Sequence, residues 1–364
     1  MGNTLSESDR RIIARVEGND QSLVRVELTS EHINEEGCRW IAKALRRNTA
    51  VKQLKLCFND IGSDGARAFM AADGLAHATA LTHLHLYGNG IGPEGARAVT
   101  ESILLNHGSR LSHLNLGGNG IGIEGAEHLA RALGGRRDDT GGGGGVRNVA
   151  TLRHLYLVDN DIGPEGAGAL AYALRTNSSL TDLDLGRNGL GSGGVGTLMS
   201  ALARSGSNSS LTHLYLGGNE VGDDGAVVLA NGLARNRGLR HVCLKSNGIG
   251  DEGAEALARS LLENKNLTRL DLMGNGNIGY GGIRAFEIAL RRNHTVLYIN
   301  LDLIRGDQGG IQQQDRGDSD GKRYTEDAAI GAIVCLLNIN AASADAAVKI
   351  KTKAAEFGVC DAES

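Results

Sequence analysis

Histidine is the residue type whose spacing in this chain first suggests chemistry. Six histidines lie inside short, similar leucine-containing segments, at His83, His85, His113, His154, His213 and His241. An imidazole can bind zinc, can titrate near neutral pH, and can make adaptable contacts with another protein. Two of these segments, LTHLHLYGNGIG (81–92) and LTHLYLGGNEVG (211–222), are so alike that duplication of one ancestral unit also explains the recurrence.

The other arrangements that carry chemistry in proteins are weak in this sequence. A metal site at His83, His85 and His113 would lack supporting cysteines or carboxylates at ligand spacing, so we expect no metal. Stacked imidazoles oppose each other's protonation, which leaves a pH-sensitive surface as a further hypothesis. No Ser/His/Asp, paired-carboxylate or Cys/His arrangement stands out from the repeated segments, so we expect no catalytic residues and no cofactor.

An internal repeat runs through most of the chain and contains the histidine segments. Its clearest mark is an asparagine, found at Asn59, Asn89, Asn119, Asn160, Asn188, Asn219, Asn247 and Asn275. Three of the intervals between them are 28 residues, and the others are 28 plus an insertion. Degenerate copies at 23–33 and 296–304 bring the predicted number of units to about ten.

Each unit predicts a strand, a turn and a helix. The L-x-x-L-x-L core alternates like a strand whose leucines point inward. The asparagine three residues later can bond backbone groups of neighbouring units, and loss of one such rung would cost about 1–3 kcal/mol. A glycine, acidic residues and, in two units, Pro93 or Pro164 mark the start of the helix. We therefore expect a structural asparagine ladder between strand and helix.

This strand–turn–helix unit, with the pattern NxIGxxGAxxLAxxL, resembles the ribonuclease-inhibitor-like class of leucine-rich repeats. It is also similar to the repeat region of NOD-like receptors, and the resemblance covers about 21–304. It implies an α/β fold, a right-handed solenoid or horseshoe with parallel strands on the concave face and helices on the convex face. The nucleotide-binding pattern G-x-x-x-x-G-K-[ST] of those receptors does not occur in the sequence.

Four segments follow from this pattern. Residues 1–20 predict an N-terminal segment with a capping helix, and 21–304 predict the solenoid. Residues 305–324 are polar and glycine-rich and predict a disordered linker. Residues 325–364 predict a C-terminal helical segment that either caps the solenoid or binds a partner. The insertion at 134–148, with five consecutive glycines, predicts a flexible loop.

The outward-facing strand residues of such a solenoid line its concave face, which is where these proteins usually bind their targets. With nearby turn residues, the candidates are His83, His85, Tyr87, His113, His154, Tyr156, Asp182, Asp184, Arg187, His213, Tyr215, His241, Lys245, Arg269 and Asp271. Tyrosine and arginine are common among the residues that dominate protein interfaces. The sequence therefore predicts a non-enzymatic scaffold or adaptor that binds a partner protein on this face.

One alternative function and several partner classes can be weighed from the sequence. Ran GTPase-activating proteins use repeats of this class, so the resemblance also permits a GTPase-activating regulator of a small Ran-like GTPase. The net charge of −4 provides no general attraction for nucleic acid, and we expect no nucleic-acid partner.

The cellular location of the protein can be predicted from its apolar segments and from its N-terminal residues. The sequence has neither an apolar run long enough to span a bilayer nor a secretory signal, which predicts a cytoplasmic protein. The start MGNTLS fits the N-myristoylation pattern with Gly2 as the acceptor. Because one myristoyl chain binds membranes only marginally, this predicts a weak, reversible tether that could place the protein at a membrane surface.

Overall fold

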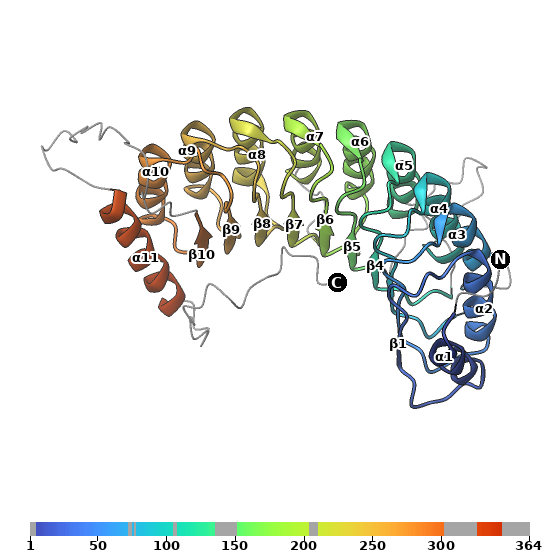
Figure 1. Ribbon diagram of the computed structural model, residues 1–364. Coiled ribbons are helices and arrows are strands. Elements are labelled where there is room, and N and C mark those ends of the chain that lie inside the picture. Colours follow the sequence, from blue (N-terminus) through green and yellow to red (C-terminus); the bar gives the residue numbers. More distant parts are fainter. Residues whose placement is uncertain are drawn as a thin grey trace, which may run out of the picture. The chain divides into compact units, whose positions relative to one another are not determined.

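The computed structural model describes residues 5–71, 75, 78–104, 108–134, 151–203, 210–301 and 326–343. Gly2, the predicted linker at 305–324 and nearly all of the glycine-rich insertion lie outside the described residues. Figure 1 labels the helices and strands along the chain. The chain divides into two compact units. Unit 1 consists mainly of residues 1–189, and unit 2 of 190–205 and 213–363.

Unit 1 starts with a helix and then alternates strands and helices. Its elements are α1 (Glu7–Glu17), β1 (Arg25–Glu27), α2 (Glu35–Leu45), β2 (Gln53–Lys55), α3 (Gly62–Met70), β3 (His83–His85), α4 (Gly92–Val99), the π-helix η2 (Thr100–Leu104), β4 (His113–Asn115), α5 (Gly122–Gly134), β5 (His154–Tyr156), α6 (Gly163–Leu174) and β6 (Asp182–Asp184). Neighbouring strands pair in parallel, and Leu54, Leu84 and Leu114 are aligned from β2 to β4.

Unit 2 continues the same alternation. Its elements are α7 (Gly191–Leu202), β7 (His213–Tyr215), α8 (Gly222–Arg235), β8 (His241–Cys243), α9 (Asp251–Leu261), β9 (Arg269–Asp271), α10 (Tyr280–Leu290), β10 (Tyr298–Asn300) and α11 (Glu326–Ser343). Strands β7 to β10 are parallel, with Leu214, Val242 and Leu270 in register. The ten parallel strands and the helices beside them confirm the predicted α/β repeat solenoid of about ten units.

The core lies between the strands and the helices of each unit. The inward leucines of the strand segments, such as Leu84 and Leu86, are fully buried. Helices approach each other closely because a Gly-Ala pair lies in the first turn or two of α3 to α6, α8 and α9. A Cβ on Gly95 would lie 2.1 Å from Cγ2 of Ile91 and 3.0 Å from Cβ of Ala66. Any larger residue at Gly95 would therefore force neighbouring repeats apart.

The helices of the repeats begin in more than one way. Helix α3 begins at Gly62, whose φ of 60° lies in the left-handed region that glycine adopts without strain. Helices α9 and α10 instead follow an extended glycine and take their cap from the preceding repeat. Asp223 Oδ1 accepts hydrogen bonds from the backbone N–H groups of Gly250 and Gly253, at 2.7 and 2.9 Å. Asp251 does the same for α10.

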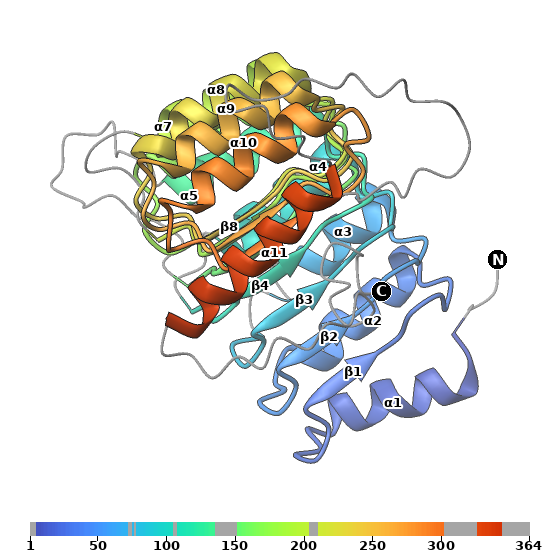
Figure 2. The same cartoon turned by 90° about the vertical axis from the view of Figure 1, so that its left-hand side faces the viewer.

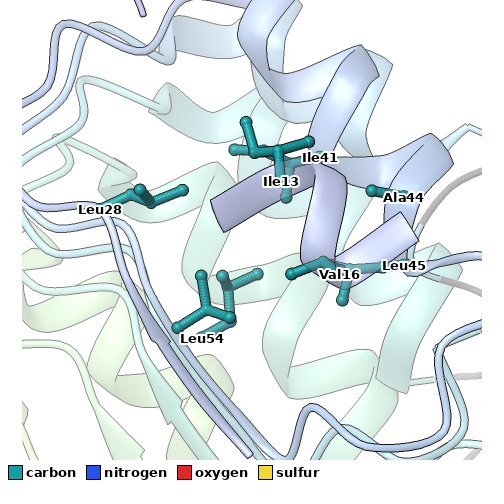
Figure 3. A pocket seen from close by; sticks show the side chains of 8 residues that line it. Ile13, Val16, Leu28, Ile41, Ala44, Leu45 and Leu54 are labelled. Carbon is teal, nitrogen blue, oxygen red and sulfur yellow. The ribbon is translucent and has the colours of Figure 1, made fainter. Parts of the chain in front are cut away.

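Helices lie against the first and last repeats of the array (Figure 2). At the N-terminal end, α1 packs on α2 and buries Val16. A small apolar cavity remains between α1 and the first repeat, lined by residues that include Ile13, Val16 and Leu54 (Figure 3). At the C-terminal end, α11 packs on α10 and buries Ala329, Ile333 and Asn340.

Candidate functional site

The eight repeat asparagines are buried and bonded to backbone groups. Asn119 is representative: its Nδ2 donates to the carbonyl oxygens of Leu86 and Leu116, both at 2.9 Å. Its Oδ1 accepts from the N–H groups of Asn89 and Ile91 in the preceding repeat, at 2.9 and 3.3 Å. With both ends of the amide used this way, these side chains join repeats and have no atoms to offer a ligand.

A second asparagine ladder, which the sequence analysis missed, lies at the other end of the helices. It comprises Asn48, Asn177, Asn236, Asn264 and Asn293. Asn264 Nδ2 donates to the carbonyl of Leu233 at 2.6 Å, and its Oδ1 accepts from the N–H of Leu267 at 2.8 Å. A sequence pattern could have predicted this ladder, because each of these asparagines lies three residues before the first leucine or valine of a strand segment. These residues are structural as well.

The third and fifth residues of the strand segments, together with the seventh residue in the turn after each strand, form a surface on the side away from the helices, which we call the strand face. In unit 1 it carries three stacked imidazoles. The ring centroids of His83 and His113 are 3.9 Å apart, as are those of His113 and His154. Adjacent strands lie about 4.7–4.9 Å apart, so the rings are closer than their backbones. Such convergence is typical of side chains on a concave face.

Polar neighbours fix these imidazoles in place. His83 Nδ1 lies 2.8 Å from Thr82 Oγ1, and His113 Nδ1 lies 2.8 Å from Ser112 Oγ. His154 Nδ1 lies 3.3 Å from a carboxylate oxygen of Asp182. One ring nitrogen of each histidine is thus engaged within the protein.

The imidazole at the centre of the stack, His113, is uncharged at neutral pH. Burial, and after it the neighbouring imidazoles of His154 and His83, lower the pKa of His113 to about 4. Burial and the charge of Lys55 likewise lower the pKa of His85 to about 4. These rings therefore present a flat, polar and neutral surface, since protonation of one would repel the next.

The far end of the unit 1 strand face is acidic. Burial raises the pKa of Asp184 to about 6, against a hydrogen bond that its Oδ1 accepts from the N–H of Gly186 at 2.8 Å. Burial and then the nearby carboxylate of Asp182 raise the pKa of Tyr156. Arg187 is exposed in the turn after β6, 3.8 Å from Asp159, so it belongs to the rim.

Aromatic rings border the same face in the turns after β2 and β3. Phe58 is 47% exposed, and its ring packs edge-on against Tyr87 with centroids 5.2 Å apart. The Tyr87 ring packs closely against a glycine, because a Cβ on Gly117 would come within 2.6 Å of its Cδ2 atom. This pair adds apolar area next to the imidazoles, and Phe58 belongs with the candidate residues.

Unit 2 groups His213, Tyr215, His241, Lys245, Arg269 and Asp271 on its own strand face. Two of these predicted contact residues are buried rather than accessible: His241 is 6% exposed and Asp271 is 2% exposed. The His241 ring is flanked by the rings of Tyr215 and His213, with centroids at 5.1 and 5.6 Å. Asp271 is enclosed by bonds from Asn300 Nδ2 and the N–H of Met273, at 3.1 and 3.2 Å. Neighbouring side chains therefore remove both from the surface.

The remaining candidates on the strand face keep partial exposure. His83, His85, Tyr87, His113, His154, Tyr156, Asp182 and Asp184 are half-buried in unit 1, and His213, Tyr215, Lys245 and Arg269 are half-buried in unit 2. Within the described ranges, no group of three or more histidine, cysteine or acidic side chains could hold a metal ion. Among the described helices, none is long and apolar enough to cross a membrane.

Comparison with known proteins gives a family and a fold. The family model described as "Leucine Rich repeat" matches eight segments that together make up more than half of the chain. They are residues 47–70, 77–99, 111–130, 150–171, 176–199, 207–230, 235–258 and 263–286. None of the curated proteins matches this sequence significantly.

Several solved structures are similar to this chain at low sequence identity, and the first of them shares its fold. The leucine-rich repeat-containing protein LegL7 from Legionella pneumophila is 18% identical, with a TM-score of 0.53, over 94% of this chain and 98% of that one. Rad7, in its yeast complex with Elc1, is 16% identical with a TM-score of 0.43, over 79% of this chain and 76% of that one. The tropomodulin C-terminal domain from Caenorhabditis elegans is 14% identical with a TM-score of 0.38, over 49% and 94%.

Proposed function

Because the chain belongs to the leucine-rich repeat family, whose members generally bind other proteins, we propose that it is a non-enzymatic scaffold or adaptor. The partner protein binds on the strand face, through the half-buried imidazole, tyrosine and charged side chains. One observation carries the proposal: three stacked imidazoles whose ring nitrogens are held by Thr82, Ser112 and Asp182. Side chains ordered before binding lose little entropy when a partner arrives.

The fold itself does not need these rings. The third strand position holds glutamine at Gln53, aspartate at Asp182 and arginine at Arg269, and all three strands pair in the same register. Packing of the core therefore leaves this position free to vary. A surface that is free to vary and yet rigid is what a repeat protein uses to select its partner.

We further propose that the repeats are of the ribonuclease-inhibitor-like class and similar to those of NOD-like receptors. Two observations support this: the intervals between asparagines, which are 28 residues or 28 plus an insertion, and an α-helix of 8–14 residues after each strand, from α2 to α10. The repeat class affects the geometry of the strand face, but it does not identify the partner protein.

A pair of tyrosine variants tests the strand-face proposal. Tyr156 lies on the strand face, and Tyr172 lies on α6 of the same repeat with 73% exposure on the helical side. In proximity labelling and affinity capture, Tyr156→Ala should remove the main partner, whereas Tyr172→Ala should retain it. Thermal melts must first show that both variants are folded. A partner retained equally by both variants would contradict binding on the strand face.

A GTP hydrolysis assay separates the scaffold from its alternative, a GTPase-activating regulator of a small Ran-like GTPase. The purified chain is added to a panel of small GTPases, and release of phosphate is followed. A scaffold leaves each rate unchanged. Acceleration of any one of them would replace the scaffold proposal with the regulatory one.

We also propose a cytoplasmic protein with a weak, reversible membrane tether through a myristoyl group on Gly2. The support is the start MGNTLS, although Ser6 has a second use as the N-cap of α1, where its Oγ accepts from the N–H of Asp9 at 3.1 Å. The intact mass of protein made in a eukaryotic host decides the matter. A mass without the acyl group would remove the tether from the proposal.

A further inference from the structure

The hydrogen bonds of two stacked imidazoles in unit 1 determine which ring nitrogen carries the proton. Thr82 Oγ1 donates its single proton to the carbonyl oxygen of Lys52 at 3.0 Å, so toward His83 Nδ1, at 2.8 Å, it can only accept. Ser112 Oγ likewise donates to the carbonyl oxygen of Thr82 at 3.2 Å and accepts from His113 Nδ1 at 2.8 Å. Both imidazoles therefore carry the proton on Nδ1, and their Nε2 atoms are lone-pair acceptors.

These two Nε2 atoms, which we call the acceptor row, are open to solvent. Neither has a hydrogen-bond partner in the described part of the chain, where the imidazole nitrogen that is both buried and unbonded is Nε2 of His241. The rings of His83, His113 and His154 are stacked at interplanar angles of 15°. Because a lone pair lies in the plane of its ring, stacked rings present their lone pairs side by side. Such lone pairs do not converge on one metal ion, but they suit separate N–H donors.

The charges on this face favour a cationic donor at its β6 end. Asp184 accepts a hydrogen bond from the N–H of Gly186 at 2.8 Å, and it forms no ion pair within the described residues. Burial raises its pKa to about 6, as expected for a carboxylate without a neighbouring cation. Tyr156 is its partner in register on β5. At the β1 end, by contrast, Lys55 Nζ already has a carboxylate oxygen of Glu27 at 3.8 Å.

We propose that the strand face of unit 1 binds an arginine-containing basic segment of the partner protein. Guanidinium N–H groups of the segment donate to Nε2 of His83 and His113, and its positive charge lies toward Asp184. A guanidinium fits because it offers several N–H donors in one plane and no acceptor, so each contact with the acceptor row joins a donor to a lone pair. This inference rests on the proposed protein-binding function and names the chemistry of the segment that unit 1 selects.

NMR of the histidine rings tests the acceptor row before any partner is added. In the full-length chain near neutral pH, nitrogen-15 spectra of the imidazoles should show the proton on Nδ1 in both His83 and His113. The tautomer is measured directly, so the result does not depend on a substitution that could disturb the fold. A proton on Nε2 of either ring would make that position a donor and overturn the proposal.

An acetylated tetra-arginine peptide is the direct probe of binding to the full-length chain. Tetralysine carries the same charge without the planar fork of donors, and tetraglutamate carries the opposite charge. In isothermal titration, tetra-arginine should bind at least about tenfold more tightly than tetralysine, and it should shift the Nε2 signal of His113. Equal affinities for the two basic peptides would rule out guanidinium recognition. Tighter binding of tetraglutamate would show that the expected charge of the segment is wrong.

Matched variants separate this site from general attraction of a basic peptide to a chain of net charge −4. His113→Phe keeps a flat ring without nitrogens, and Asp184→Asn keeps the shape without the charge. Each should weaken tetra-arginine binding about tenfold, the effect of losing one charge-assisted contact. His128→Gln and Glu124→Gln change the same residue classes on α5, on the helical side, and should leave binding unchanged. Equal affinities across all four variants would exclude the site.

Capture of the partner distinguishes failure of this inference from failure of the function on which it rests. If Tyr156→Ala abolishes capture while His113→Phe and Asp184→Asn retain it, the arginine site is wrong and the scaffold remains. If none of the three affects capture, the strand-face function itself is wrong. Both proposals are supported if all three lose the partner, His128→Gln and Tyr172→Ala retain it, and tetra-arginine displaces it from the wild type.

Discussion

At the scale of single residues, one position of the repeat has several different environments. The third strand residue is a bonded, stacked imidazole at His113, a carboxylate 3.3 Å from His154 Nδ1 at Asp182, and a buried imidazole whose Nε2 has no hydrogen-bond partner at His241. The repeat pattern predicted where these side chains are attached, because strand alternation depends on the backbone. It did not predict that His241 and Asp271 are buried, because that depends on the sizes and bonds of Tyr215 and Asn300 in adjacent repeats.

The stacked histidines should make stability depend on pH. The pKa of His113 is about 4 in the folded chain and about 6.5 in an ordinary setting, so between these values only the unfolded state takes up the proton. The contribution of His113 to the free energy of unfolding is therefore fully present above about pH 6.5, and it falls as the pH drops toward 4. Because the ring is partly exposed, the slope from His113 should be well below the ~1.4 kcal/mol per pH unit of a fully buried group.

Chemical denaturation of the wild type and His113→Gln between pH 4 and 8 measures this slope. The variant should lose less stability on acidification. Asp184 acts in the opposite direction, since its raised pKa of about 6 favours the folded state as the pH falls, but it is present in both proteins. Parallel stability curves for the two proteins would show that the stack does not resist protonation.

At the scale of elements, repeats are joined by more than packing of apolar side chains. The sequence predicted acidic residues in the first turn of six of the helices, from Asp64 to Glu252, as partners of the helix dipole. In α8 and α9 the structure gives them a further role, because Asp223 and Asp251 each cap the helix of the following repeat. This could not be read from one unit, because it requires the extended backbone of Gly250 and Gly279 next to the preceding helix.

Removal of one such cap should destabilise the following helix. In Asp251→Ala, the N–H groups of Gly279 and Gly282 lose an acceptor held at 2.8 Å, and the expected cost is about 0.5–2 kcal/mol. Glu252→Ala, at the next and exposed position, should change stability by less than about 0.5 kcal/mol. Urea denaturation measures both. Equal effects of the two substitutions would mean that only the helix dipole matters.

At the scale of the whole molecule, the stability of each repeat should depend on the repeats next to it. Each helix contacts its sequence neighbours within a unit, and the terminal helices α1 and α11 lie against the first and last repeats. Helix α11 also continues the second asparagine ladder, since Asn340 Nδ2 donates to the carbonyls of Asn293 and Val296 at 3.1 and 2.8 Å. Helix α11 thus supplies unit 2 with the hydrogen bonds that a further repeat would have provided.

Loss of the α11 contact should loosen the chain from its C-terminal end only. Ile333 is 4% exposed where α11 packs on α10, and Val334 beside it is 51% exposed. Ile333→Ala removes buried apolar area and should cost about 2–4 kcal/mol in local stability, whereas Val334→Ala should cost less than about 0.5 kcal/mol. Because each repeat is coupled to its neighbours, amide hydrogen exchange should accelerate most in α10 and β10, less in α9, and not at all in α2 and α3. Uniform acceleration in both units would instead show that the chain unfolds as one cooperative body and that α11 stabilises all of it.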